Sequence, residues 1–475
     1  MNHYLFRLLF ILFFAFNACK KDNSFLKDSG SLKFSKDTIY FDTVFTKLPN
    51  SNYPRSINKQ FMVRNPYNQS VSINVKLNPN SVYRINVDGR SGNDIKGIEI
   101  LPKDSAWVFV EATLTPNNVS NPVLIKDSIE FETNGNKQYV QLAAYGWDAY
   151  YFKDSVFDIN TNWILTDKPY VIVNSIFVNE NVTFTIGPGI HVYSTPNSTF
   201  KNSITNKLIN ISAINVFGTM KVNGTKSKPV IFEGDRLDNN FSDVAGQWRG
   251  IHFYRKSINN EINYSIIKNS TIGLWVDSLP ENGNNNPNLK IKNTIIKNIS
   301  AYGILGLTAV IEAENTVVSN CGLNTFIGYY GGFYTFNHCT LFSTSSGRND
   351  PHVILNNQLR NDNKVVIKTY PIGFTFINSI IYGSQKNEIG TDLSSTTVAS
   401  PSIIQNCLLK LESQLVGSTG NIYNQDPKFE DVFKQNFKLK SDSPAKDKGI
   451  ATSLSTDFEG NSRVGLPDIG AYEIQ

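Results

Sequence analysis

Charged side chains are scarce in this sequence. Asp, Glu, Lys and Arg make up 18% of the 475 residues, below the roughly 25% that is usual for soluble domains. The 45 basic and 40 acidic residues leave a net charge of +5, and no run of five basic residues occurs. We therefore expect no nucleic-acid partner, because such surfaces need clustered Lys and Arg. The mild positive charge is compatible with an acidic glycan.

Cysteine is also rare, with four in the chain. Cys19 belongs to the N-terminal segment, which leaves Cys321, Cys339 and Cys407 in the body of the protein. An odd number at wide spacing is not typical of a disulfide framework. The absence of Cys-x-x-Cys motifs and Cys–His clusters excludes a common zinc site. We expect three buried free thiols, no metal centre and no cofactor, with Ca²⁺ as the one ion left open.

Long hydrophobic runs are missing as well, so no transmembrane helix is expected. The longest run, from Leu8 to Phe16, is too short to span a bilayer and follows Arg7. Residues 1–19 are therefore predicted to be an export signal. The string Phe16-Asn17-Ala18-Cys19 resembles the lipobox of bacterial lipoproteins, which implies acylation of Cys19. The alternative is a plain signal peptide with a chance Cys.

Residues 20–33 are polar and are predicted to form a flexible tether. Their first four residues, Lys20-Lys21-Asp22-Asn23, resemble the charged tag of Bacteroidetes lipoproteins that reach the cell surface. A charged linker explains them equally well. We expect an outer-membrane lipoprotein at the cell surface, with a periplasm-facing location as the alternative.

Residues 34–148 are predicted to be a β-sandwich. Val71, Ile73, Val75 and Leu77 alternate with polar residues, as in a half-buried strand. Asn134-Gly135 between two β-rich runs is a strong hairpin signal. The segment resembles Ig-like domains of the Hydin type in four strings: Phe41-Asp42-Thr43-Val44, Arg64-Asn65-Pro66, Asp127-Ser128-Ile129 and Ala143-Ala144-Tyr145-Gly146. That resemblance implies that the domain binds a partner or acts as a spacer.

Residues 150–410 are predicted to form a parallel β-helix, because short strands and sharp turns recur there without helical segments. A triplet of one polar and two apolar residues recurs, its first residues spaced by 29, 22, 24, 39 and 28. The triplets are Ser265-Ile266-Ile267, Thr294-Ile295-Ile296, Thr316-Val317-Val318, Thr340-Leu341-Phe342, Ser379-Ile380-Ile381 and Cys407-Leu408-Leu409. Polar insertions at 279–288 and 345–364 account for the long spacings.

Four of the six triplets follow an asparagine directly: Asn293, Asn315, Asn378 and Asn406. We expect a structural Asn ladder at one corner, where stacked amides satisfy buried polar groups. Chance in an Asn-rich chain is the weaker alternative. Leucine-rich repeats and propellers are not favoured, because the Leu pattern and the antiparallel blades are missing.

The region resembles the right-handed parallel β-helix, or pectate-lyase-like, superfamily, notably in Asn181 to Val192 and in Gln247-Trp248-Arg249-Gly250-Ile251. Residues 411–475 resemble the choice-of-anchor Q ending, with Asp426-Pro427-Lys428-Phe429 and Pro467-Asp468-Ile469-Gly470-Ala471-Tyr472-Glu473. We expect this segment to cap the open end of the helix. The whole chain resembles a Bacteroidetes lipoprotein family with this Ig-like plus β-helix layout, which implies location and shape but no activity.

Few residues in the sequence suggest catalysis or metal binding. No Asp-Asp pair and no Gly-His-Gly motif of pectin hydrolases occurs. His338, Asp350 and His352 form the most suggestive cluster, since two of them lie in an insertion; a strand histidine and a solvated loop are the favoured alternative. Glu312 and Glu314 share one face of a strand, where they would bind Ca²⁺ or act as acid and base, although an exposed strand face is favoured.

Two functions remain open from the sequence. The first is a lipid-anchored, non-enzymatic surface protein that binds an extracellular polysaccharide or a surface protein. The alternative is a polysaccharide lyase or glycoside hydrolase that acts in a groove of the β-helix beside the insertion at 345–364. A purely structural spacer is third. Converging carboxylates, or a base with a Ca²⁺ site, would favour the enzyme. A flat polar face would favour binding.

Overall fold

The computed structural model describes residues 24–48, 56–195, 199–201, 208–210, 212–238, 240–277, 286–345, 348–394, 398, 402–414 and 418–475. The predicted export signal and Cys19 lie outside these residues. All regular secondary structure in the described part is β-strand, which confirms the all-β class. The chain divides into two compact units at residues 148 and 149, and each is described here by itself.

The first unit is a sandwich of two five-stranded sheets. One sheet holds β1 (Lys33–Phe34), β3 (Lys59–Arg64), β8 (Ser105–Ala112), β5 (Tyr83–Val87) and β6 (Arg90–Ser91). The other holds β2 (Thr38–Phe45), β10 (Asn136–Trp147), β9 (Val123–Thr133), β4 (Val71–Lys76) and β7 (Asp94–Ile100). Alternate residues of each strand enter one apolar core that includes Phe41, Phe61 and Phe131. The predicted sandwich is confirmed.

The Asn134-Gly135 turn joins β9 and β10 in the predicted hairpin. Both residues have positive φ, 48° and 82°, as a tight turn between twisted strands requires. Thr133 and Asn136 form the first pair of an antiparallel ladder that runs to Val123 and Gly146.

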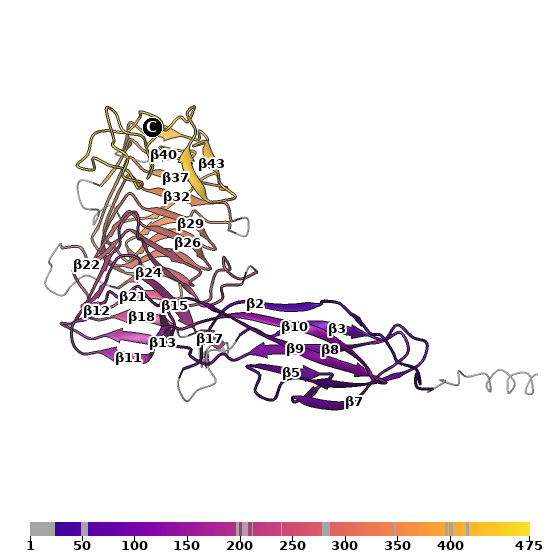
Figure 1. Ribbon diagram of the computed structural model, residues 1–475. Coiled ribbons are helices and arrows are strands. Elements are labelled where there is room, and N and C mark those ends of the chain that lie inside the picture. Colours follow the sequence, from indigo (N-terminus) through magenta and orange to yellow (C-terminus); the bar gives the residue numbers. More distant parts are fainter. Residues whose placement is uncertain are drawn as a thin grey trace, which may run out of the picture. The chain divides into compact units, whose positions relative to one another are not determined.

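The second unit is a parallel β-helix with three faces, and Figure 1 shows its strands stacked from β11 and β13 to β37 and β40. Face A consists of β12 (Thr161–Trp163), β14 (Thr183–Ile186), β19 (Thr219–Asn223), β22 (Asn260–Asn263), β25 (Leu289–Lys292), β28 (Val310–Glu314), β31 (Gly332–Asn337), β36 (Ile372–Ile377), β39 (Ile403–Gln405) and β41 (Ser418–Thr419).

Face B consists of β15 (His191–Thr195), β20 (Val230–Gly234), β23 (Ser265–Lys268), β26 (Ile295–Ile299), β29 (Val317–Cys321), β32 (Thr340–Ser343), β37 (Ile380–Gly383), β40 (Leu408–Leu409) and β42 (Ile422–Tyr423). Face C consists of β11 (Tyr150–Phe157), β13 (Tyr170–Val178), β18 (Ala213–Val216), β21 (Gly250–Phe253), β24 (Ile272–Val276), β27 (Tyr302–Leu307), β30 (Asn324–Tyr329), β33 (Val353–Asn356) and β38 (Ile389–Asp392). From β13 to β40 the chain visits the faces in the order C, A, B and supplies one strand to each face per coil. The first half of β13 also pairs with β15 of face B, and the last coil consists of β41 and β42 alone.

The predicted triplets all lie on face B, and five of them stack in the expected register. The ladder pairs Ile267 with Ile296 and Ile296 with Val318, and these inward side chains are fully buried. The triplet placed at Thr340 was wrong by one residue. Thr340 pairs with Val317, so the stacked triplet of this coil begins at Cys339. Cysteine fills the inward site there because it packs as a small apolar residue.

This correction places a histidine in the asparagine row. Asn293, Asn315, Asn378 and Asn406 have φ between 45° and 49°, and His338 occupies the same position in its coil with φ 51°. Asn tolerates this left-handed conformation better than most residues. The Asn315 amide also donates to Asn293 Oδ1 at 3.2 Å, so neighbouring coils are joined along the corner.

Two boundaries differ from those that the sequence suggested. The ladder of face B continues to β42, beyond residue 410. The insertion placed at 345–364 is interrupted by β33 of face C. After β33 the chain leaves the helix as an antiparallel hairpin of β34 (Gln358–Arg360) and β35 (Val366–Thr369). A second hairpin, β16 (Thr199–Lys201) with β17 (Leu208–Asn210), follows β15.

The C-terminal segment packs along the outside of face B. It contains the hairpin of β43 (Phe429–Asp431) and β44 (Asn436–Leu439). Apolar side chains of the segment and the outward apolar row of face B together form a cluster that is separate from the core inside the helix. Gly470, at φ 110°, donates its N–H to the Asn378 carbonyl, and an added Cβ would lie 2.8 Å from Ile380. These contacts place the segment on the flank of the helix, where the sequence suggested only a cap over its end.

Candidate functional site

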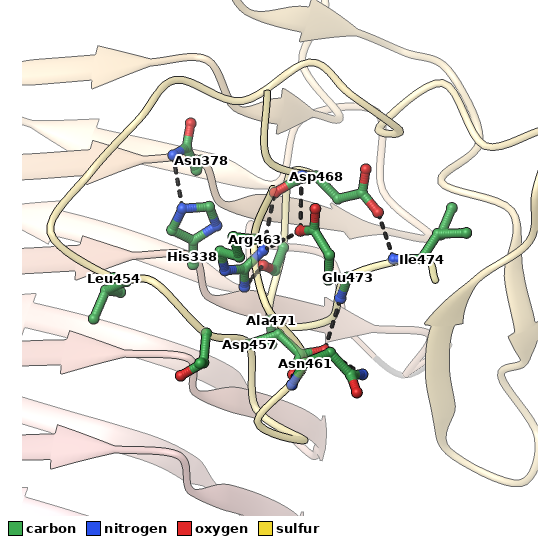
Figure 2. A network of polar contacts seen from close by, with 12 residues as sticks. His338, Asn378, Leu454, Asp457, Asn461, Arg463, Asp468, Ala471, Glu473 and Ile474 are labelled. Carbon is green, nitrogen blue, oxygen red and sulfur yellow. Dashed lines mark hydrogen bonds and ion pairs between the residues drawn. The ribbon is translucent and has the colours of Figure 1, made fainter. Parts of the chain in front are cut away.

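His338 lies between β31 and β32 and is fully buried. Its Nε2 is 2.9 Å from the amide nitrogen of Asn378, as Figure 2 shows. Burial, followed by the positive charge of Arg463, lowers the pKa of His338 to about 3, so the ring is neutral at pH 7. Because its ring has no exposed surface, His338 has no direct contact with a ligand. It takes the place of an asparagine in the row at this corner.

His352 and Asp350 lie at another corner, where face B leads into face C. The buried Arg348 guanidinium forms two hydrogen bonds with Glu388, of 2.7 and 3.0 Å. The fully buried His352 has its Nδ1 2.6 Å from Thr325 Oγ1, and burial together with Arg348 lowers its pKa to about 3. Asp350 is exposed. The suggested cluster is therefore divided between two corners, and both histidines hold the coil together.

Glu312 lies on the outside of face A, in a ladder of alternating charge. Lys221, Glu261, Lys290 and Glu312 occupy successive coils in one row. Lys221 pairs with Glu261 at 3.5 Å, and Lys290 pairs with Glu312 at 3.2 Å. In the next row Lys292 pairs with Glu314, also at 3.2 Å. These six side chains keep between 28% and 45% of their surface exposed, so both charges of each pair remain accessible.

A hollow of about 380 Å³ opens on this ladder. Its polar lining includes Lys221, Glu261, Lys290, Lys292 and Asn259. The position of each lysine follows from strand alternation: their neighbours in β19 and β25 point inward and are fully buried. Farther along the same face the outward row continues with Thr335 and Thr375. The outward side chains of this surface are polar and partly exposed, so they can form hydrogen bonds with a ligand.

A second cluster, on face C, was not suggested by the sequence. The rings of His252 and Trp275 are 4.1 Å apart, and Tyr254 stacks on the other side of His252 at 3.8 Å. His252 Nε2 is 2.9 Å from Asp277 Oδ2, and Arg249 lies over Trp275. His252 is buried between the two rings, while Tyr254 and Trp275 are each partly exposed. In the sequence His252 is a single histidine within a strand, which does not predict that Tyr254 and Trp275 stack on its ring.

No group of three or more His, Cys, Asp and Glu side chains in the described part of the chain is arranged to hold a metal ion. Cys321, Cys339 and Cys407 are free and buried, as expected, and burial raises the pKa of Cys339 to about 12. Asp235, beside Thr195, has its pKa raised to about 6 by burial. Among the described residues there is no helix of the length and apolarity needed to cross a membrane.

Comparison with known proteins gives no family. No family model matches the chain, and no curated protein matches it. Among solved structures, the chain is similar to the ASH/PapD-like domain 7 of human CEP192, with 9% identity, a TM-score of 0.18, and coverage of 26% of this chain and 88% of that one. It is also similar to a Porphyromonas gingivalis W83 protein of unknown function, with 11% identity, a TM-score of 0.18, and coverage of 27% and 60%.

The longest of these similarities covers 76% of this chain and 75% of the other. That structure is the catalytic unit of a thermostable GH87 alpha-1,3-glucanase from Streptomyces thermodiastaticus strain HF3-3, with 11% identity and a TM-score of 0.26. All three TM-scores are low, so we transfer no activity from these proteins. The fold defines an all-β protein with a sandwich and a parallel β-helix, and face A of the helix carries a polar, solvent-accessible hollow.

Proposed function

We propose that this chain is a lipid-anchored protein of the bacterial surface whose β-helix binds an extracellular polysaccharide on face A. The observation that supports binding is the hollow lined by Lys221, Glu261, Lys290 and Lys292. It offers donors and acceptors on a rigid ladder, which keeps the cost of ordering the site low. Acylated Cys19 would hold the chain at the outer membrane.

Retention during electrophoresis through gels that contain acidic or neutral polysaccharides tests this proposal. The variant Lys221→Ala/Lys290→Ala/Lys292→Ala removes three donors, each worth about 0.5–1.5 kcal/mol as a hydrogen bond. We expect retention to weaken by about 10- to 1,000-fold, since about 1.4 kcal/mol corresponds to a factor of ten.

The matched control removes three lysines from the C-terminal half of the same unit. They are exposed and lie outside the hollow: Lys386, Lys428 and Lys434. We expect this control to be retained like the original protein. Equal weakening in both variants would indicate a nonspecific charge effect and contradict the site. Shortening of the polysaccharide chains, measured on the same samples by size-exclusion chromatography, would contradict a binding role without catalysis.

A further inference from the structure

We infer that the ligand of the hollow on face A is a neutral polysaccharide rather than an acidic one. This inference rests on the proposed function and specifies its ligand. The overall charge of +5 suggests the opposite preference, but the local charges decide what a ligand meets at the site.

The charges at the ladder cancel. Three lysines and three glutamates face outward there, and each lysine ammonium lies 3.2 to 3.5 Å from a glutamate carboxylate. Lys221, Glu261, Lys290 and Lys292 line the hollow itself, and Glu312 and Glu314 adjoin it as the ion-pair partners of Lys290 and Lys292. Neighbouring strands of a sheet are about 4.8 Å apart. A polyanion along the helix axis would therefore meet a carboxylate beside every ammonium, at a distance where like charges repel by about 1 kcal/mol in water. The attraction from the lysines is offset by this repulsion.

The hydrogen-bonding capacity is not used up by the ion pairs. An ammonium group has three donors and a carboxylate has about four acceptor positions, while each pair on face A uses one close contact. Asn259 adds an amide to the lining. Sugar hydroxyls donate and accept at once, so a neutral chain uses both partners of each pair. A carboxylate group accepts only, so wherever an acidic chain places one beside an ion pair the glutamate gains no new partner there.

Paired probes test the inference. Dextran, curdlan and hydroxyethyl cellulose are each offered beside their carboxymethylated forms, and retention of the full chain is measured at about 0.05 M and 0.5 M NaCl. We expect at least one neutral polymer to be retained about tenfold more strongly than its carboxymethylated form, with little effect of salt, because screening weakens only charge-based attraction.

The variant Glu261→Gln/Glu312→Gln/Glu314→Gln leaves the three lysines without carboxylates. We expect it to gain retention by the carboxymethylated polymers, and this gain should disappear at high salt. The matched control replaces three carboxylates that pair with lysines elsewhere in the unit: Asp431, Glu412 and Asp442. It should gain no such retention.

The possible failures are distinguishable. Stronger retention of the original protein by carboxymethylated polymers would overturn the inference and leave polysaccharide binding in place. The absence of retention by all polymers, neutral and acidic, would remove the proposed function itself. If the glutamine variant gained no affinity for the acidic polymers, charge balance on face A would not be the cause of the preference.

Discussion

Replacing Arg463 tests how firmly the C-terminal segment is held on face B. Only 2% of this side chain is exposed, and Figure 2 shows it among polar groups of the segment. It forms an ion pair with Glu473 at 2.8 Å and donates to Asn315 Oδ1 at 3.1 Å and to the Gly470 carbonyl at 3.1 Å. Burial raises the pKa of Asp468 and Glu473, which shows how little solvation these carboxyls retain.

The expected cost of Arg463→Met is large, because the replacement leaves a buried carboxylate without its partner. Breaking a buried pair in this way costs about 3–5 kcal/mol. The β-helix unit runs from residue 149 to residue 475, and unfolding entropies near 2.1 cal/mol/K per residue give about 0.7 kcal/mol/K for it. A loss of about 4 kcal/mol then lowers the Tm of this unit by about 6 °C.

Differential scanning calorimetry measures the shift, and hydrogen exchange locates it. We expect the amides of residues 445–474 to lose protection first. Arg360→Ala is the matched control, since Arg360 pairs with Asp392 in the same unit but keeps 37% of its side chain exposed, and such pairs contribute at most about 1 kcal/mol. If Arg463→Met shifted the Tm no more than the control, the buried network would not be what holds the segment.

Two further predictions concern His338 and Cys19. Because the folded pKa of His338 is lowered to about 3, the unfolded chain binds a proton between about pH 6.5 and 3 that the folded chain does not, and stability falls as pH drops through this window. His338→Asn places at this corner the residue type that the neighbouring coils have. Between pH 7 and pH 5 the variant should lose about 2 kcal/mol less unfolding free energy than the original protein. If thermal unfolding showed the same loss for both proteins, this reasoning would be refuted. Cys19→Ala should leave export intact but abolish incorporation of labelled palmitate, and retained label would exclude the anchor.

The repeat of the β-helix was predictable because inward and outward positions alternate within each strand. The error at Thr340 has a specific cause. Thr340-Leu341-Phe342 matches the pattern of one polar and two apolar residues, but Phe342 points outward into the C-terminal apolar cluster. In this coil the outward position that is apolar in the neighbouring coils holds Thr340, and the next outward position holds Phe342, so the polar–apolar–apolar pattern is displaced by one residue. The coverage of face B by a distant segment is a tertiary effect, which local sequence does not encode.

The hollow on face A was not predictable for a related reason. Lys221, Glu261, Lys290 and Glu312 become neighbours because the intervening loops differ in length and still complete one coil each. From the sequence, Glu312 and Glu314 were placed correctly on one face of a strand, but their lysine partners lie a full coil away. Only the register between coils identifies such pairs.

The position of the C-terminal segment has a consequence for how the unit folds. In an array of repeats, each coil contacts mainly its two neighbours, so ends can fray independently. Here Asn315 accepts a hydrogen bond from Arg463, 148 positions later in the chain, and the apolar outer row from Ile295 to Ile422 is closed by the last fifty residues. Middle and late coils therefore become mutually dependent, and the array gains this cooperativity only after residues 426–475 have been synthesised.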